Sequence, residues 1–585
     1  MSNHIMASTD IIIGIVGSGG DGVITAGEFI VSAVSSEGLF SFLLKSYGPQ
    51  IRGGESSCRV RISQNPVQSQ GDDLDVLVVL SWADYLKFEH EIELKENTAI
   101  VHDEDDPMPE DHVERWAAHP TYRIPFKRLA KEEMQTILTK NIIMLGSLVE
   151  LFGLPERGIR HAIERKFGKK SAGVVEKNLE ALACGKRYVA ENITKADDWR
   201  LEYEASEPKL VMEGNAATAL GAAVAGCRFY AGYPITPASE VMHWMASHLP
   251  SVGGTVVQAE DEISAAGMVV GASFGGTKSM CATSGPGFTL KSEMLGLASM
   301  AEVPMVIVDV QRGGPSTGIP TKSEQSDLMQ AVYGSHGDCP RVVIAPTDVE
   351  DCFDTAVYAF DIAEEFQIPV VLLSDQFIAQ RKETVRPFEV GRRKVFDRVK
   401  PNNEQLTDYK RYRLDTETGV SPMAVPGMPG GQYPASGIEH NEVGDPTSRI
   451  ELHNSMTEKR YRKYKYIVEK YSFVRRYGDD DAEVGVLAWG STKGVVKEAI
   501  ARLQEEGYKV GAMIPQLLHP FPMEAFDQFL AGKKRLVVAE LSYRGQFLQF
   551  IRSRCAISAP IHHIARPGGK PFTVREITDA LREVL

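Results

Sequence analysis

Short apolar runs alternate with longer, helix-compatible stretches along almost the whole chain. The runs are five to seven residues long, which suits buried strands, and the stretches between them can form crossover helices. This alternation is typical of α/β proteins with largely parallel sheets. We therefore expect an α/β fold made of modules of mostly parallel sheet with flanking helices. No short internal repeat is evident, which weighs against a solenoid.

The expected elements fall into three groups. The first group contains strands at 11–17, 39–45, 58–63, 74–80 and 98–102, a helix from Val23 to about Ser36, and a helical region from about 142 to 193. The second group contains strands at 228–232, 255–259, 278–283, 305–311, 341–345 and 369–374. The third group contains strands at 483–490, 509–515 and 534–541 and a closing helix at 573–584.

The length of 585 residues corresponds to three or four domains. We place modules at 1–195, 209–395 and 480–585, with a polar linker at 196–208 and an interdomain arm at 396–479. Residues 396–460 are rich in Gly, Pro, Asn and Asp. So much chain without periodicity is unusual inside a compact domain, and it predicts an interdomain connection or an interface arm.

Composition excludes several classes of protein. The net charge of −14 argues against a nucleic-acid binder, which needs surplus Lys and Arg on one face. No apolar run is long enough to cross a bilayer, and MSNHIMASTD lacks the features of a secretory signal. The seven scattered cysteines contain no C-x-x-C pair and the histidines show no zinc motif, so we expect no disulfide framework, no metal and a cytoplasmic setting. The basic-aromatic tract KRYRKYKY (459–466) could suggest RNA contact, but a subunit-docking arm or the solvated start of a helix is favoured.

A glycine loop, GSGGDG (17–22), follows the first expected strand and precedes a helix. Gly17, Gly19 and Gly20 would let backbone N–H groups approach a phosphate, although a tight turn also explains them. An NAD(P) site expects an acidic residue at the end of the second strand, whereas that strand ends in Lys45 and continues into SYGPQIRGGES, which contains Arg52. The loop therefore predicts an anion site rather than a dinucleotide site.

GDG also opens the magnesium-diphosphate motif of thiamine diphosphate enzymes, which needs an asparagine about 25–30 residues later. The first asparagine after Asp21 is Asn65, which is far too distant. No other GDG occurs. We therefore expect that this chain cannot hold magnesium diphosphate alone.

Four motifs in the second module are more specific. They are YAGYPITPASE (230–240), QAEDEISAAGMVVGAS (258–273), CATSGPGF (281–288) and VQRGGPSTGIPTKSEQSDL (310–328). They resemble the α chain of the 2-oxoacid:ferredoxin oxidoreductases, most of all its 2-oxoglutarate type, and YPITP is the most particular match. The resemblance implies a Rossmann-like γ module at 1–195, a thiamine diphosphate pyrimidine-binding domain at 209–395 and a transketolase-C-like domain at 480–585.

By this resemblance, Glu262 is the carboxyl group that hydrogen-bonds the pyrimidine N1′ and drives formation of the imino tautomer. In related enzymes this glutamate begins a helix of small residues with a glycine nine positions later, as Gly271 follows here. Glu260 and Asp261 are competing carboxylates. Alternatively, Glu262 is only a solvent-exposed residue at the start of a helix.

The resemblance also assigns substrate and cofactor residues. The Thr236 hydroxyl would meet the 2-oxoacid, although a helix N-cap or turn also suits a threonine there. Arg312 would hold the substrate carboxylate, for which a guanidinium fork is well shaped, and Lys45 would reach the far end of a dicarboxylate. The other residues expected at the cofactor are Pro234, Ile235 and Gly285, and those on the CoA side are Gly17, Gly19, Gly20 and Arg52.

The resemblance implies a subunit that converts 2-oxoglutarate, CoA and oxidised ferredoxin reversibly into succinyl-CoA, CO₂ and reduced ferredoxin, so that the reverse reaction would fix CO₂ as in the reductive TCA cycle. Thiamine diphosphate would be shared with a β subunit that holds Mg²⁺ and a [4Fe–4S] cluster, in an (αβ)₂ assembly. Pyruvate, branched-chain or aryl 2-oxoacids stay open as substrates. A non-catalytic docking subunit and an NAD-dependent dehydrogenase are the alternatives of other classes.

Overall fold

The computed structural model describes residues 7–48, 54–391 and 395–585. Contacts between Cα atoms divide the chain into two compact units. The first contains the chain up to Met212 together with Arg381–Pro387 and Thr573–Arg575, and the second contains Glu213–Gln380, Phe388–Phe572 and Glu576–Leu585. Arg52, one of the residues expected on the CoA side, lies outside the described residues.

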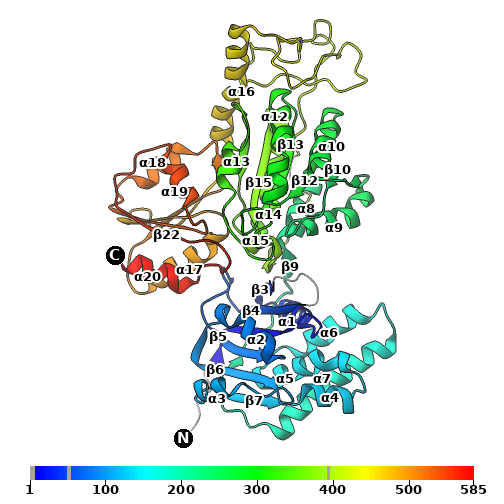
Figure 1. Cartoon of the computed structure of the whole chain (residues 1–585), viewed down its shortest axis with the longest axis vertical. Helices are drawn as coiled ribbons and strands as arrows, with labels where there is room; N and C mark the ends of the chain where they lie inside the picture. Colours follow the sequence, from blue (N-terminus) through cyan, green and yellow to red (C-terminus); the bar gives the residue numbers. More distant parts are fainter. Residues whose placement is uncertain (1–6, 49–53, 392–394) are drawn as a thin grey trace. The chain divides into compact units, whose positions relative to one another are not determined.

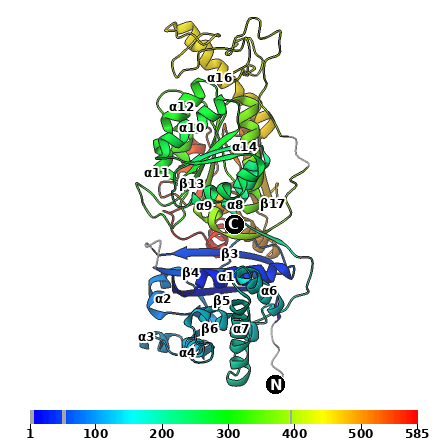
Figure 2. The ribbon, with the colours of Figure 1, turned by 90° about the vertical axis from the view of Figure 1, so that its right-hand side faces the viewer.

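The first unit is built on an eight-stranded mixed sheet, whose blue strands are seen in Figures 1 and 2. Its strands are β2 (Asp10–Ser18), β3 (Phe40–Tyr47), β4 (Glu55–Ser63), β5 (Leu74–Val79), β6 (Leu94–Asp103), β7 (Thr121–Ile124), β9 (Leu210–Glu213) and β16 (Lys382–Val385). The order is β7-β6-β5-β2-β4-β3-β16-β9, in which β7, β6, β5 and β2 are parallel, whereas β2, β4, β3 and β16 alternate in direction. A separate parallel pair joins β1 (Ala7–Ser8) and β8 (Arg200–Leu201).

Successive residues of a strand point to opposite faces of the sheet, and both faces of this sheet carry apolar side chains. Helices therefore cover both faces. Ile11, Ile13 and Ile15 of β2 belong to the larger apolar core, whereas Ile12 and Val16 belong to a smaller core rich in tryptophan and tyrosine. The helices of this unit are α1 (Val23–Ser36), α2 (Trp82–Phe88), α3 (Glu110–Arg115), α4 (Phe126–Glu132), α5 (Lys140–Phe152), α6 (Glu156–Phe167) and α7 (Ala172–Asn192), with short 3₁₀ turns at Glu89–Glu91 and Ile137–Thr139.

The second unit contains a seven-stranded and a five-stranded sheet. The seven-stranded sheet has the order β11-β10-β12-β13-β15-β14-β20, from β10 (Phe229–Gly232), β11 (Thr255–Gln258), β12 (Ser279–Thr283), β13 (Met305–Gln311), β14 (Val342–Ile344), β15 (Pro369–Asp375) and β20 (Leu517–His519). The five-stranded sheet has the order β17-β19-β18-β21-β22, from β17 (Val474–Gly478), β18 (Val484–Leu487), β19 (Gly511–Pro515), β21 (Arg535–Glu540) and β22 (Ile561–Ala565). Only β20 and β17 are antiparallel to their neighbours in these two sheets.

The helices of the second unit follow the strands in the expected alternation. They are α8 (Gly214–Val224), α9 (Ser239–His248), α10 (Glu262–Phe274), α11 (Gly285–Leu290), α12 (Ser292–Met300), α13 (Leu328–Tyr333), α14 (Val349–Phe366), α15 (Gln376–Gln380), α16 (Ile450–Tyr471), α17 (Lys493–Glu505), α18 (Met523–Leu530), α19 (Gln546–Arg552) and α20 (Val574–Arg582), with 3₁₀ turns at Leu249–Val252 and Gly490–Thr492. Three α/β sheets are therefore present, and the expected fold class is confirmed. The first sheet departs most from a parallel arrangement.

Residues 395–449 contain no helix or strand, yet they carry buried side chains such as Arg398, Tyr412 and Met423. Arg398 donates to both carboxylate oxygens of Glu364, at 2.7 and 2.6 Å. Side-chain contacts with the rest of the unit therefore hold this segment in place, although it forms no helix and no strand.

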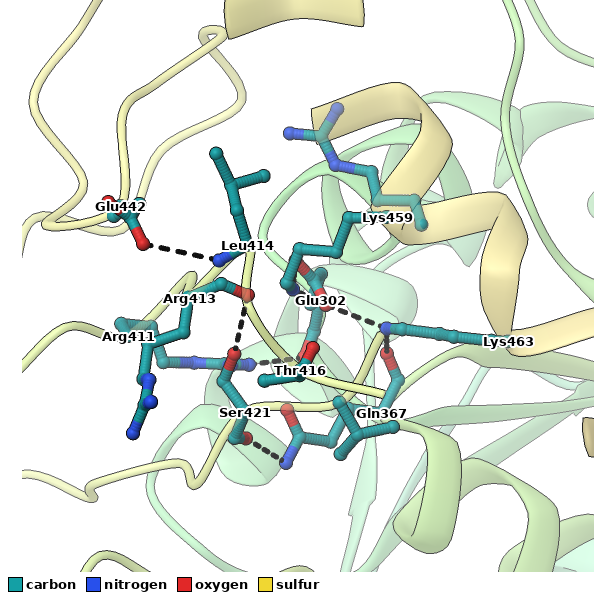
Figure 3. A network of polar contacts seen from close by, with 12 residues as sticks. Glu302, Gln367, Arg411, Arg413, Leu414, Thr416, Ser421, Glu442, Lys459 and Lys463 are labelled. Atoms are coloured by element: carbon teal, nitrogen blue, oxygen red, sulfur yellow. Dashed lines mark hydrogen bonds and ion pairs between the residues drawn. The ribbon is translucent and has the colours of Figure 1, made fainter. Parts of the chain in front are cut away.

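The tract KRYRKYKY is not the solvated start of a helix, whereas its role in subunit docking stays a prediction. It lies in the middle of α16, and Lys459, Arg460 and Lys463 are buried. Lys459 and Lys463 both donate to the Glu302 carboxylate (Figure 3). Periodicity alone could not show this, because the counter-ion lies more than 150 residues earlier in the chain. Among the described residues, no helix is long and apolar enough to cross a membrane.

Candidate active site

The four motifs of the second module meet at one edge of the seven-stranded sheet. YPITP follows β10, α10 follows β11, the SGPGF turn follows β12, and Arg312 follows β13. These strands run parallel to one another, so their carboxyl ends lie at the same edge. In open α/β sheets this edge is where ligands bind.

Glu262 is the first residue of α10. The Asp261 carboxylate accepts a hydrogen bond from the Ser264 N–H at 2.7 Å and caps the helix. Because Asp261 is the capping residue, the Glu262 side chain is left for another partner. It is only 8% exposed, and no described residue hydrogen-bonds or ion-pairs with its carboxylate.

The turn after β12 is shaped around this glutamate. A Cβ atom at Gly287 would lie 2.6 Å from Glu262 Cγ and 2.2 Å from Thr283 Oγ1. Only glycine therefore allows the turn and the carboxylate to pack together. At Gly285 a Cβ would lie 2.9 Å from Asp327 Oδ2, so this position is also held close to a carboxylate.

Arg312 and Thr236 are brought together directly. The Arg312 Nη1 donates to the Thr236 backbone carbonyl at 2.5 Å. Arg312 is 6% exposed, and within the described part of the chain it has no direct ion pair and its Nε has no hydrogen-bond partner. A buried cation without a direct ion pair is costly, so this guanidinium is well placed to receive an anion.

The YPITP segment forms a turn rather than a helix cap. The Ala238 N–H donates to the Ile235 carbonyl at 2.8 Å, and α9 begins only at Ser239. Pro234 is exposed, whereas Ile235 and Thr236 are half-buried. The segment therefore presents its backbone and side chains along the same edge as Glu262.

Sequence reasoning missed three titratable residues around this edge. Lys291 and Asp309 are buried, and Asp327 is half-buried. Burial raises the pKa of Asp327 to about 7, with Glu324 adding to the rise and Arg312 opposing it. Asp309 could have been noticed as the one carboxylate inside the apolar run MVIVDVQ.

Lys45 and the glycine loop belong to the first unit. Lys45 lies in β3, with its Nζ 4.0 Å from Glu28 Oε1. In the loop, the Gly19 N–H donates to Gly54 O at 2.7 Å, and a Cβ at Gly20 would meet no atom within 4 Å. Gly17 lies at the end of β2.

A carboxylate already occupies part of the glycine loop. Asp21 accepts a hydrogen bond from the Ser18 N–H at 3.0 Å and from Lys140 Nζ at 2.6 Å. A phosphate there would have to share the loop with Asp21, so the open side at Gly20 is the more suitable face. The role of these glycines in CoA binding stays a prediction.

The site suits one half of a thiamine cofactor. A nearly buried carboxylate without a partner fits a protonated ring nitrogen, as the Glu262 assignment requires. The residues that the structure describes contain no group of three or more His, Cys, Asp or Glu side chains able to hold a metal ion. Within those residues the chain therefore offers a buried carboxylate without a partner, and no set of side chains for a metal.

Fold and site define a subunit of a thiamine diphosphate-dependent oxidoreductase, and three family models match the chain in the order of its sheets. They are pyruvate ferredoxin/flavodoxin oxidoreductase at 12–188, the thiamine diphosphate-binding region of pyruvate flavodoxin/ferredoxin oxidoreductase at 220–459, and pyruvate:ferredoxin oxidoreductase core domain II at 482–577.

Full-length relatives agree with these models. The 2-oxoacid:ferredoxin oxidoreductase α subunit of Saccharolobus solfataricus is 30% identical, with 97% of each chain covered. The 2-oxoglutarate oxidoreductase subunit KorA of Mycobacterium tuberculosis is 31% identical over 98% of this chain and 92% of its own. A solved structure of 2-oxoglutarate:ferredoxin oxidoreductase from Magnetococcus marinus, with 2-oxoglutarate, coenzyme A and succinyl-CoA bound, is 42% identical with a TM-score of 0.92, and covers 98% of this chain and 99% of that one. The chain belongs to the 2-oxoacid:ferredoxin oxidoreductase α subunits.

Proposed function

We propose that this chain is the α subunit of a 2-oxoglutarate:ferredoxin oxidoreductase. The reaction takes 2-oxoglutarate and CoA to succinyl-CoA and CO₂, while two electrons pass to ferredoxin, and it is reversible. The observation that carries the proposal is the buried Arg312, which forms no direct ion pair with any described residue and lies at the same sheet edge as Glu262. The full-length similarity to a structure holding 2-oxoglutarate, coenzyme A and succinyl-CoA supports the choice of substrate.

Each residue has a physical task in this proposal. Thiamine diphosphate, when bound, supplies the nucleophilic carbon that attacks a 2-oxoacid carbonyl. Glu262, which is only 8% exposed, holds and moves a proton at the pyrimidine N1′. Arg312 pairs with the carboxylate next to the reacting carbonyl, and its contact with the Thr236 carbonyl fixes the direction of the fork.

A partner subunit is required for the rest of the chemistry. We propose a β subunit that holds the diphosphate, Mg²⁺ and a [4Fe–4S] cluster, in an (αβ)₂ assembly. This sequence contains no C-x-x-C pair, and it lacks the asparagine of the magnesium-diphosphate motif at the required distance after GDG. Lys45 and the glycine loop are proposed for the far carboxylate of the substrate and for CoA, respectively.

The test is an assay of the purified αβ complex with 2-oxoglutarate and pyruvate in parallel, together with its thiamine diphosphate and iron contents. We expect preferential 2-oxoglutarate-dependent, CoA-dependent dye reduction. A preference for pyruvate would refute the assignment of substrate, and Lys45→Ala should reduce activity with the dicarboxylate more than with pyruvate.

A non-catalytic docking role is separated by Glu262→Ala. This variant should abolish turnover while the complex still assembles, because the carboxylate forms no hydrogen bond with any described residue. Unchanged turnover would favour the docking role instead.

A further inference from the structure

A fully buried lysine lies directly behind Glu262. Lys291 joins α11 to α12 and is 0% exposed, and its ammonium donates to the backbone carbonyl of Glu262 at 3.0 Å. No carboxylate in the described ranges forms an ion pair with it. Since a buried ammonium is costly unless it is paired, this residue calls for an explanation beyond packing.

A buried acid faces the same region from β13. Asp309 lies beside Thr283 of β12 in the sheet register, so the two side chains lie on the same face. Thr283 Oγ1 in turn borders Gly287, which packs against the Glu262 side chain. Asp309 is 0% exposed, and neither of its carboxyl oxygens has a hydrogen-bond partner among the residues described.

The charged and titratable groups around Lys291 come from three elements. Asp261 and Glu262 lie at the start of α10, Cys281 lies in β12, and Asp309 lies in β13. Burial lowers the pKa of Lys291, and these groups oppose that change. Burial, followed by Asp327, raises the pKa of Asp309 well above its ordinary value, and Lys291 opposes the rise.

We propose that Lys291 is a positioning residue for Glu262. The Lys291 ammonium holds the first turn of α10 in place through its hydrogen bond to the Glu262 carbonyl, and it places a positive charge behind the carboxylate. Helices α10 and α12 and strand β13 are labelled in Figure 1. This inference rests on the proposed function, because it assumes that Glu262 meets the aminopyrimidine ring.

The consequence concerns the bound cofactor. A positive charge close to the pyrimidine ring disfavours protonation of the ring nitrogen. Lys291 should therefore lower the pH at which the bound cofactor is protonated. Asp309, whose pKa burial raises, offsets this charge less than an ionised carboxylate would.

The test uses the full αβ complex and one substitution at each of the two buried residues. Lys291→Met removes the positive charge and keeps the length of the side chain, and Asp309→Asn removes the acid and keeps its shape. The readouts are the dissociation constant of thiamine diphosphate and the pH midpoint of the near-ultraviolet circular dichroism bands of the bound cofactor's tautomers. We expect Lys291→Met to weaken binding about tenfold and to raise the midpoint by about one pH unit, and Asp309→Asn to move the midpoint much less.

Lys278→Met is the matched control. Lys278 is also buried and donates to a backbone carbonyl, that of Ala225 at 3.0 Å, but it precedes β12 and so lies at the end of that strand opposite the site. It should change thermal stability without moving the midpoint. A Lys291→Met midpoint equal to that of the wild type overturns the inference, as does an effect on stability alone.

Two further outcomes keep the result interpretable. If Lys291→Met does not fold, Lys291→Gln takes its place, and a midpoint equal to that of the wild type then overturns the inference, whereas a raised one supports it. Failure of the proposed function is recognised separately, because a wild-type complex without bound thiamine diphosphate would show no such bands at all.

Discussion

Glu302→Gln is expected to release the irregular segment 395–449 and helix α16 from the second unit. Glu302 lies just after α12, and its two carboxylate oxygens accept hydrogen bonds from Lys459 Nζ at 2.5 and 2.7 Å and from Lys463 Nζ at 2.7 Å (Figure 3). Arg411 Nη2 donates to the Glu302 backbone carbonyl at 2.7 Å. The side chains of Glu302 and Lys459 are 0% exposed, so water cannot replace these contacts.

The magnitude follows from the burial of the cluster. The substitution keeps the shape of Glu302 but leaves two buried ammonium groups without a counter-ion. Breaking a buried pair in this way costs about 3–5 kcal/mol of stability. Glu365→Gln is the matched control, because Glu365 pairs with Lys470 of the same helix but the two side chains are 26% and 42% exposed. An exposed pair contributes at most about 1 kcal/mol.

The assay is hydrogen exchange of the full chain at neutral pH. At about 1.4 kcal/mol for each factor of ten, Glu302→Gln should accelerate exchange of the amides of α16 that are most protected by roughly a thousandfold, and Glu365→Gln by less than tenfold. Equal effects of the two substitutions would refute the reasoning, and so would acceleration spread evenly over both units.

Acid should act on the same cluster. Burial would raise the pKa of Glu302, but Lys459, Lys463 and Arg411 outweigh burial and hold the pKa well below its ordinary value of 4.5. Because the folded-state pKa is the lower one, the carboxylate's contribution is complete above about pH 4.5 and is lost as the pH falls through the folded value. Unfolding of Glu302→Gln should therefore depend less on pH than that of the wild type in acid.

Other substitutions test the site and the segment. Arg312→Lys should raise KM for the 2-oxoacid about ten- to a hundredfold in steady-state assays, because a point charge replaces a fork, and an unchanged KM would contradict the carboxylate contact. Gly287→Ala should abolish thiamine diphosphate binding by calorimetry, since its Cβ would lie 2.6 Å from Glu262 Cγ, whereas Gly296→Ala, with no neighbour closer than 3.6 Å, should not. Burial would raise the pKa of Glu439, but the cationic partners of this carboxylate outweigh burial and lower the pKa to about 2. Glu439→Gln should therefore remove a contribution to stability that the wild type loses between about pH 4.5 and 2. Acid titrations of unfolding would show this difference.

Much of the fold could be predicted because the strands of the central sheets are continuous apolar runs. The predicted runs at 305–311 and 369–374 correspond to β13 and β15, and α10 begins at Glu262 as the small-residue pattern indicates. Such runs are fully buried on both faces, so composition alone marks them. The module limits at 195, 209, 395 and 480 stay predictions.

The partners of buried polar groups could not be predicted, because they depend on distant parts of the chain. Strand β16, at 382–385, pairs with β3 of the N-terminal sheet, although the sequence places it at the end of the second module. The lysines of α16 look solvated in sequence and become buried only because Glu302 meets them. Local periodicity carries no information about either pairing.

Buried charges in the second unit include paired and unpaired groups. At the irregular segment Glu302 pairs with Lys459 and Glu364 with Arg398, whereas among the described residues Arg411 donates only to the Glu302 backbone carbonyl. At the carboxyl edge of the seven-stranded sheet, by contrast, Lys291 and Arg312 form no ion pair with any described residue, and the carboxyl oxygens of Asp309 have no hydrogen-bond partner there. Stability would favour pairing or removing such groups, so their concentration around Glu262 argues that this edge is shaped for ligands that supply the missing partners.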